Sequence, residues 1–261
     1  MCERSMLFSN ELSVIQQKMA ASSAGIERRL EILKNLNFVK GQTILDIGCG
    51  GGHLLPDLAL AVGKEGKILG LDPSEAQIEA AMTRCNKINN IELLRLPANK
   101  TNLQANSVDI VTSTQTLEYI KNVDSALEEI ARVIKNKSQF VNVSILWDHF
   151  KFHGPENHLN ELIHETFKDH CFHQMLPMEL NMRLSRQGFE NISSRGLPFL
   201  VTKRHENSPA KYSEEVLALF ALKQGIPEDK VSDWRLQLSK AEEDGRFGFT
   251  SYPVITKANL K

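Results

Sequence analysis

Short apolar runs and helical stripes of apolar residues alternate along the middle of this chain. In the helix expected at 126–135, Leu127, Ile130 and Ile134 recur at helical spacing, with charged residues between them. Apolar runs that predict strands fall near 43–47, 66–71, 91–95, 108–113 and 139–145. Strands and helices that alternate at this spacing are typical of a parallel sheet. We therefore expect a doubly wound α/β fold, which binds ligands at the carboxyl ends of its strands.

Further helices and strands are expected on both sides of this region, and two segments do not follow the strand–helix alternation. Residues 10–36 predict two helices, and further elements are expected as a helix at 177–187 and strands at 189–193 and 248–255. Residues 147–176 predict helix plus loop, and residues 208–244 predict helices at 212–224 and 228–241. We expect a single domain over 1–261, with N-terminal helices within 1–40 and with 147–176 and 208–244 as helical lid insertions over the carboxyl edge.

The composition is that of a globular domain and gives no sign of nucleic-acid binding or of a membrane-spanning segment. The chain has 261 residues, of which 41% are hydrophobic and 24% are charged, as in an ordinary globular domain. The net charge of -1 gives no overall field that attracts nucleic acid, and the basic run 203–205 is expected to be a solvated turn. Four scattered cysteines, no secretory signal at the start and no apolar stretch of about 18 residues favour a cytoplasmic protein with free thiols and no membrane contact.

The first strand runs into a glycine-rich loop. Gly48-Cys49-Gly50-Gly51-Gly52 follows the strand at 43–47 and precedes a helical stretch from His53. A strand, a glycine turn and a helix N-terminus expose bare backbone to a ligand. The second strand ends in Asp72, where an acid can bond the hydroxyl pair of a ribose. Together these features predict a cofactor that contains adenosine.

The details of the loop distinguish between adenosine cofactors. The dinucleotide fingerprint Gly-x-Gly-x-x-Gly fails at its third glycine, where this chain has His53. A phosphate-binding P-loop would need Gly-Lys-Ser/Thr, which the loop lacks. An acid, Asp46, stands two residues before Gly48, and the dinucleotide pattern does not require one.

The loop resembles the first motif of the class I S-adenosylmethionine-dependent methyltransferases, which is an acid, a hydrophobic residue and Gly-x-Gly-x-Gly. Asp46 to Gly52 match it, 69–74 resembles the second motif, and 98–120 resembles the third and fourth. The resemblance covers roughly 36–146 and extends more loosely to the C-terminus. It implies a Rossmann-like seven-stranded sheet of order 3-2-1-4-5-7-6 with the last strand antiparallel. It also implies S-adenosylmethionine as methyl donor and S-adenosylhomocysteine as product.

The chain departs from the family pattern at two points. Pro97 replaces an acid that usually bonds the adenine amino group, so adenine would rely on the Ala98 backbone N–H and on Asn99. The turn after helix 126–135 lacks its usual glycines, and Asn136 is expected to take the left-handed backbone instead. The core of the expected cofactor site is unaffected by either change.

The resemblance and the strand ends together assign the site. The expected cofactor-binding residues are Asp46, Gly48, Cys49, Gly50, Gly52, Asp72, Pro73, Ala98, Asn99, Thr114 and Gln115. Asp46 either bonds the methionine end of the cofactor or holds the loop through its amides. On the acceptor side, Gln115, Glu118 and Tyr119 follow the fourth strand, and Trp147 and His149 follow the fifth.

Methyl transfer from a sulfonium is an in-line displacement that depends mainly on holding the nucleophile about 3 Å from the methyl carbon. A base is needed only where the acceptor carries a proton. His149 and Glu118 are the candidate catalytic residues, because an imidazole titrates near neutrality and Glu118 follows a strand end. The alternatives are a surface histidine and a carboxylate that braces the neighbouring helix.

The histidine-rich segment 149–173 raises the question of a metal. His149 and His153 could share a helix face, and His170, Cys171 and His173 offer nitrogen and sulfur ligands. Spacing alone permits many such sets and no HExxH pattern is present, so we assign no metal and expect a polar lid.

The sequence thus favours methyl transfer to a small-molecule acceptor under the two lid insertions, which would exclude water. Near-neutral charge and the lack of an Asn-Pro-Pro-Tyr type signature make tRNA or protein a second choice of substrate. A protein that binds S-adenosylmethionine without turnover is the third, because Pro97 removes an expected adenine ligand. The oligomeric state is not encoded in any recognisable pattern.

Overall fold

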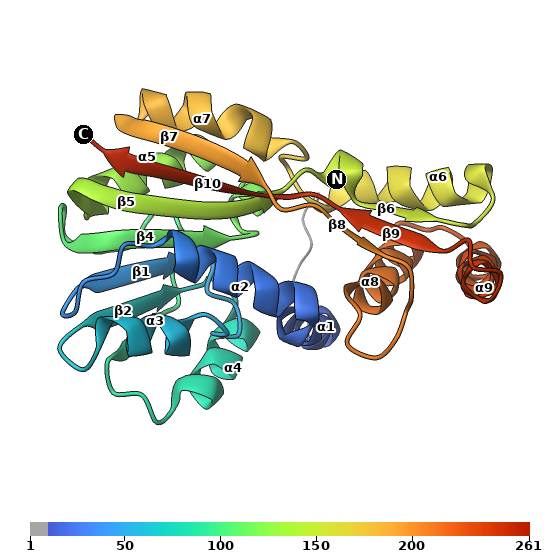
Figure 1. Ribbon diagram of the computed structural model, residues 1–261, viewed down its shortest axis with the longest axis horizontal. Coiled ribbons are helices and arrows are strands. Elements are labelled where there is room, and N and C mark those ends of the chain that lie inside the picture. Colours follow the sequence, from blue (N-terminus) through green and yellow to red (C-terminus); the bar gives the residue numbers. More distant parts are fainter. Residues whose placement is uncertain (1–9) are drawn as a thin grey trace.

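The computed structural model describes residues 10–261. Within that range seven strands form one sheet (Figure 1), in the order β3-β2-β1-β4-β5-β10-β7. The strands are β1 (Thr43–Ile47), β2 (Lys67–Leu71), β3 (Ile91–Leu94), β4 (Val108–Thr114), β5 (Ile134–Ile145), β7 (Phe189–Gly196) and β10 (Pro253–Leu260). β10 lies antiparallel between β5 and β7, and the pairs from β3 to β5 are parallel. This confirms the expected order, because the last strand lies beside the fifth.

Helices cover both faces of this sheet. On one face, α2 (Ser23–Asn35), α3 (Leu55–Val62) and α4 (Glu75–Cys85) pack against apolar side chains of the strands. On the other face lie α5 (Val123–Val133) and α7 (Leu176–Arg186). Val123, Ala126, Leu127, Ile130 and Val133 of α5 are buried and lie on one face, which explains why this stretch folds as an amphipathic helix.

A second, smaller lobe continues from the carboxyl edge of the sheet (Figure 1). Its elements are the antiparallel strands β6 (Lys151–His153), β9 (Gly248–Ser251) and β8 (Phe199–Val201) and the helices α6 (Asn157–Phe167), α8 (Pro209–Lys223) and α9 (Glu228–Glu243). We call these elements the lid lobe. An apolar cluster of its own holds it together, in which the Phe152 ring lies 5.4 Å from that of Trp234 and 4.6 Å from that of Phe249.

The lid lobe differs from the sequence prediction in three details. Segment 147–176 contains strand β6 as well as helix, and the single strand expected at 248–255 is two strands, β9 and β10, in different sheets. The chain changes sheet at Tyr252, whose carbonyl accepts a bond from Leu146 N at 3.0 Å. The run 203–205 is not a solvated turn throughout, because Arg204 pairs with Glu214 at 2.7 Å and with Glu242 at 3.1 Å and is only 11% exposed.

The turn after α5 also differs. The helix ends at Val133 and β5 begins at once with the buried Ile134, which is paired with Val108. The left-handed residue is Lys137, with φ 61°, rather than Asn136. The strand register shifts within this stretch, so residues 135–138 form an irregular part of a strand and not a separate turn.

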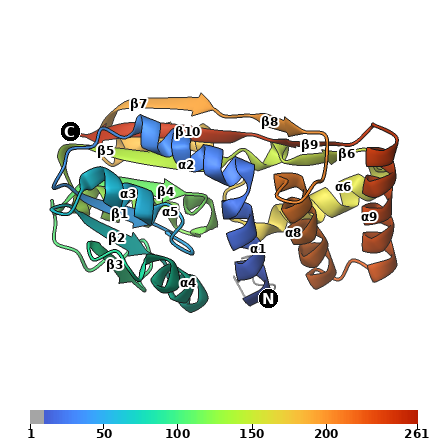
Figure 2. The same ribbon diagram turned by 60° about the horizontal axis from the view of Figure 1, so that its bottom comes forward.

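Helix α1 (Asn10–Ala21) lies across the space between α4 and α8 (Figure 2). It ends at Ala21, and the next residue is Ser22, whose hydroxyl accepts a bond from Gly25 N and so caps α2. The N-terminal helices expected within 1–40 are therefore α1 and α2, while residues 1–9, including Cys2, lie outside the described part. Among the helices of residues 10–261, none has the length and apolarity that a membrane crossing requires.

Candidate functional site

A cavity of about 450 Å³ lies at the carboxyl edge of the sheet, bounded on its other sides by α1, α2 and the lid lobe. One end is lined by residues that the sequence assigns to a cofactor. These are Asp46, Gly48, Cys49, Gly50, Asp72, Pro73, Ala98, Asn99, Thr114 and Gln115. The structure therefore brings together residues that come from the ends of β1, β2 and β4 and from the loop after β3.

The glycine loop is held by the end of β2. The backbone N–H groups of Gly48 and Cys49 both donate to the carbonyl of Leu71, at 2.7 and 3.0 Å. Gly48 has φ 70°, and a Cβ added to it would lie 2.0 Å from Thr116 Oγ1. A side chain is therefore excluded here both by backbone conformation and by space.

Gly52 differs from the other predicted glycines, because it does not line the cavity. Its φ is 74°, and an added Cβ would come within 3.0 Å of Ala81 Cβ on α4. This glycine lets the loop pack closely on α4, and the structure gives no support to a cofactor contact by Gly52.

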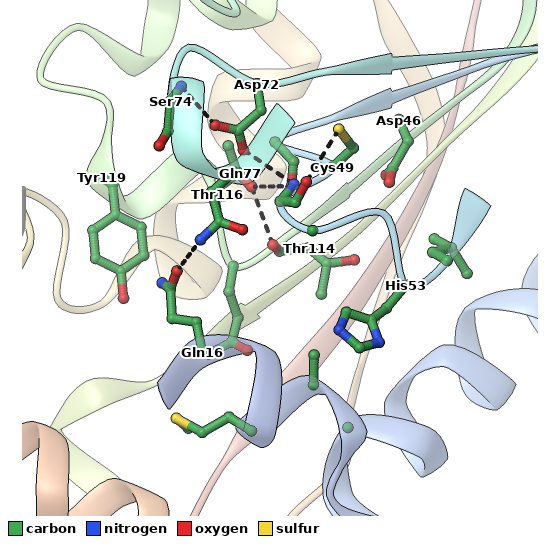
Figure 3. Close-up of a pocket in the computed structure, with 18 of the residues that line it drawn as sticks. Gln16, Asp46, Cys49, His53, Asp72, Ser74, Gln77, Thr114, Thr116 and Tyr119 are labelled. Atoms are coloured by element: carbon green, nitrogen blue, oxygen red, sulfur yellow. Dashed lines mark hydrogen bonds between the residues drawn. The ribbon is translucent and has the colours of Figure 1, made fainter. Parts of the chain in front are cut away.

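Asp72 bonds the glycine loop and lines the cavity (Figure 3). Its Oδ2 accepts a bond from Gly50 N at 3.0 Å and its Oδ1 accepts one from Ser74 N at 2.9 Å. Burial raises the pKa of this carboxyl, and these two backbone bonds oppose the rise. Each carboxylate oxygen has more than one acceptor site, so Asp72 keeps capacity for a hydroxyl pair.

Asp46 is buried at the end of β1 and takes one hydrogen bond, from Thr112 Oγ1 to its Oδ1 at 2.8 Å. Within the described residues no loop amide donates to it, so it does not hold the loop in that way. Burial raises the pKa of Asp46 to about 7, the Thr112 bond opposes this, and the nearby Asp72 adds to it. Its second oxygen lies beside the cavity and can accept a bond from a cationic ligand group.

Polar residues that sequence reasoning missed also lie at the cofactor end of the cavity. Gln77 on α4 lines the cavity, and its Nε2 donates to Gln16 Oε1 on α1 at 2.6 Å. Arg84 donates from Nε to the Gly51 carbonyl at 2.8 Å and lies 2.9 Å from Nε2 of His53. Burial and the nearby cations lower the pKa of His53 to about 4, so His53 is neutral and accepts this bond.

The opposite end of the cavity is aromatic. Tyr119 and Trp147 line it as the strand ends predict, together with Phe150 and Phe167. Other lining residues of the cavity come from helices that sequence motifs did not single out, namely Arg28 on α2 and Ser213 and Val216 on α8. Arg29 on α2 also lines the cavity, and its charge acts on His53 beside the glycine loop. No local pattern marks them, because their position depends on how α2 and α8 pack against the sheet edge.

Neither candidate base lies at the cavity. His149 is exposed, and its ring lies 5.6 Å from that of Tyr252 on the outer side of a 3-10 turn, η2 (Trp147–His149). That turn directs Trp147 inward and His149 outward, so the prediction of a catalytic His149 is not supported.

Glu118 is fully buried beneath the cavity wall in the turn η1 (Leu117–Tyr119). It accepts bonds from Ser144 Oγ at 2.9 Å and from Ile145 N at 3.4 Å, and its carbonyl accepts from the N–H groups of Phe172 and His173. Burial raises its pKa to about 7, against the effect of these bonds. The Glu118 carboxylate thus braces the end of β5 rather than the neighbouring helix, and its backbone carbonyl holds the segment at 172–173. A catalytic role for Glu118 is not supported.

The histidines of the lid are dispersed. His164 Nε2 accepts a bond from Phe152 N, and His170 donates from Nδ1 to the Phe167 carbonyl at 2.6 Å. Burial lowers the pKa of His164 to about 4 and that of His170 to about 3. In the part of the chain that the structure describes, no three His, Cys, Asp or Glu side chains gather as a metal-binding group.

Known proteins resemble this chain in sequence. A family model for a methyltransferase domain matches residues 38–211. The demethylmenaquinone methyltransferase of Oceanobacillus iheyensis is 30% identical over 159 residues, which are 56% of this chain and 66% of that protein. An uncharacterized 37.1 kDa protein from a Streptomyces fradiae transposon is 27% identical over 147 residues, which are 56% of this chain and 42% of that protein. The matches therefore span less than two thirds of the length of these relatives.

Solved structures share the fold. Phosphoethanolamine N-methyltransferase 2 of Haemonchus contortus, solved with phosphomonomethylethanolamine and S-adenosylhomocysteine, aligns over 98% of this chain and 58% of that chain. The TM-score is 0.66 and the sequence identity 17%. The YcgJ protein of Bacillus subtilis aligns over 90% of this chain and 99% of that one, with a TM-score of 0.60 and 18% identity.

The glycine loop, the acid after β2 and the antiparallel seventh strand define a Rossmann-like nucleotide-binding protein. The family match covers more than half of the chain, so the chain belongs to the class I S-adenosylmethionine-dependent methyltransferases. The family's cofactor is S-adenosylmethionine, and the site fits it. Asp72 has free acceptor capacity, Asp46 has an unpaired oxygen, and Thr114 Oγ1 is buried without a partner at the cavity wall.

Proposed function

We propose that this protein transfers the methyl group of S-adenosylmethionine to a small-molecule acceptor bound in the same cavity. The observation that carries the proposal is that the cofactor end and the aromatic end share one cavity between the sheet edge and the lid lobe. The similarities agree with a small acceptor, because one relative is named for demethylmenaquinone and one structural neighbour holds phosphomonomethylethanolamine.

The chain's residues would act by binding and positioning. S-adenosylmethionine supplies an electrophilic methyl group on a sulfonium. Asp72 would hold the ribose hydroxyls, Asp46 the ammonium group, and the Ala98 and Asn99 segment the adenine. The aromatic wall would place the acceptor in line with the sulfur and keep water out, which supplies much of the acceleration in such a displacement. With His149 outside and Glu118 below the cavity, the proposal includes no protein base.

The test begins with the cofactor. Calorimetry should show binding of S-adenosylhomocysteine that weakens by roughly 10-fold to 150-fold in Asp72→Ala, the range expected for losing hydrogen bonds to a charged group. The exposed Asp148→Ala is the matched control and should bind normally. If S-adenosylhomocysteine does not bind, or if Asp72→Ala binds it as well as the wild type does, the assignment of the site is wrong.

The acceptor class is tested with S-adenosylmethionine labelled in the methyl group. Label should pass into a low-molecular-weight metabolite extract and not into tRNA or protein. Transfer to tRNA or protein would overturn the small-molecule proposal in favour of the second candidate. Tight binding without transfer to any of the three fractions would favour the binding protein without turnover.

A further inference from the structure

Arg28 is a cation at the cavity wall without a partner. It lies on α2 and is partly buried, and within the described residues it makes no hydrogen bond or ion pair. Its neighbour Arg29, in contrast, donates to the carbonyl of Ala20. Burial lowers the pKa of Arg28 to about 10, so the guanidinium is still charged at neutral pH. A partly desolvated cation is costly unless something pairs with it.

Glu118 does not fill that role. Its negative charge acts on Arg28, but no oxygen of Glu118 lies within ion-pair distance of the guanidinium. Both of its oxygens already accept bonds, from Ser144 and Ile145. The planar fork of Arg28, with five N–H donors, therefore faces the cavity with its capacity unused.

Two further polar groups at this end lack partners. Trp147 Nε1 and Ser213 Oγ are buried without a hydrogen bond in the structure, and both residues line the cavity. The indole N–H of Trp147 can only donate. The Trp147 ring packs between two neighbours, and its centroid lies 4.3 Å from that of the His170 ring and 5.0 Å from that of the Phe150 ring. Buried polar groups without partners are rare in native proteins and call for an explanation such as a ligand.

A chain of neighbouring residues connects Arg28 with Trp147. Tyr119 interacts electrostatically with Arg28, and its ring lies 5.8 Å from that of His170, which also contacts Trp147. Ser213 is one turn before Val216 on α8, and both residues line the cavity. The carboxylates that line the cavity in the described part of the chain are Asp46 and Asp72, at the opposite, cofactor end.

We propose that the acceptor is an acidic small molecule whose carboxylate or phosphate is bound by Arg28, with the indole N–H of Trp147 and the hydroxyl of Ser213 as further donors. This inference rests on the proposed function and names the class of its substrate. The guanidinium and the indole N–H can only donate and the Ser213 hydroxyl can donate as well, so the set favours an oxyanion, and Arg28 can bind two oxygens side by side. The apolar walls Phe150, Phe167 and Val216 suit an apolar body attached to that group.

The test uses three probes that share one apolar body: phenylacetate, phenyl phosphate and the neutral phenylacetamide. Each is titrated by calorimetry into protein saturated with S-adenosylhomocysteine. We expect at least one of the two anions to bind at least tenfold more tightly than the amide, and the tighter anion distinguishes a carboxylate site from a phosphate site. Arg28→Gln should remove this preference, Arg28→Lys should keep part of it, and Arg186→Gln, an exposed arginine on α7, should leave it unchanged.

The outcomes separate this inference from the proposed function. Equal affinity for anion and amide, no binding of either anion, or an equal loss for all three probes in Arg28→Gln would overturn the acidic-acceptor assignment. Labelled methyl transfer to a neutral metabolite would do the same and leave the small-molecule proposal intact. Transfer to tRNA or protein would instead remove the proposed function itself.

Discussion

The side-chain amide of Gln77 donates to Oε1 of Gln16 at 2.6 Å and joins α4 to α1 beside the glycine loop (Figure 3). Both residues line the cavity. A second link runs from Arg84 to Gln17 Oε1 at 3.4 Å and to the Gly51 carbonyl at 2.8 Å. Helix α1 is thus fastened to the elements that would hold the cofactor, although it comes from a part of the chain without a motif.

Breaking this link should loosen the cofactor site. A neutral hydrogen bond contributes about 0.5–1.5 kcal/mol, so Gln16→Ala should raise the Kd for S-adenosylhomocysteine by roughly 2-fold to 13-fold. The change should appear mainly as faster dissociation, measured by stopped-flow fluorescence. Gln104→Ala, which removes an exposed glutamine side chain, is the control. An unchanged Kd in Gln16→Ala would show that α1 does not contribute to cofactor retention.

Two glycines with similar backbone provide a matched test of the loop. Gly48 and Gly41 have φ of 70° and 85°, but an added Cβ meets Thr116 at Gly48 and nothing within 4 Å at Gly41. Gly41→Ala should cost about 1–2 kcal/mol of unfolding free energy, from the left-handed backbone alone. Gly48→Ala should cost more and should also abolish cofactor binding. Urea unfolding and calorimetry would measure both, and equal stability of the two variants would contradict the clash with Thr116.

The cofactor end of the site was predictable because the residues that form it lie close together in the sequence. Gly48, Gly50 and Asp72 follow strand ends within one βαβ unit, and strand ends of a parallel sheet meet at one edge. A sequence pattern does not distinguish a glycine that faces a ligand from one that packs on a helix, which is where the structure places Gly52.

At the aromatic end of the cavity, the sequence predicted Tyr119 and Trp147, which lie in the turns that follow β4 and β5. Trp147 faces inward and His149 faces outward because a 3-10 turn lies between them. So short a turn produces no periodic pattern of apolar residues in the sequence. Arg28 and Ser213 reach the wall through packing between α2, α8 and the sheet edge, a long-range contact that local patterns do not encode.

Glu118 should make stability fall as pH rises through neutrality. Its pKa in the folded protein, about 7, lies above the ordinary value of 4.5, so between these values the folded protein binds more protons than the unfolded chain. The stabilisation is complete below about pH 4.5 and is lost as pH rises to 7, with a slope of at most about 1.4 kcal/mol per pH unit. Glu118→Gln should remove this slope in urea unfolding between pH 5 and 7. A parallel pH profile in wild type and variant would contradict it.

Asp46 should link cofactor binding to proton release. Burial places its pKa near 7 in the free protein, and a cationic ligand group beside it would lower that pKa. Affinity for S-adenosylhomocysteine should therefore rise with pH from 5.5 to about 7 and then level off. Calorimetry in buffers of different ionisation enthalpy should detect the released proton. Thr112→Val removes the hydrogen bond that opposes the raised pKa, so it should shift the rise to higher pH. Asp46→Asn should bind weakly at every pH, and a pH-dependent rise that persists in Asp46→Asn would assign the proton to another group.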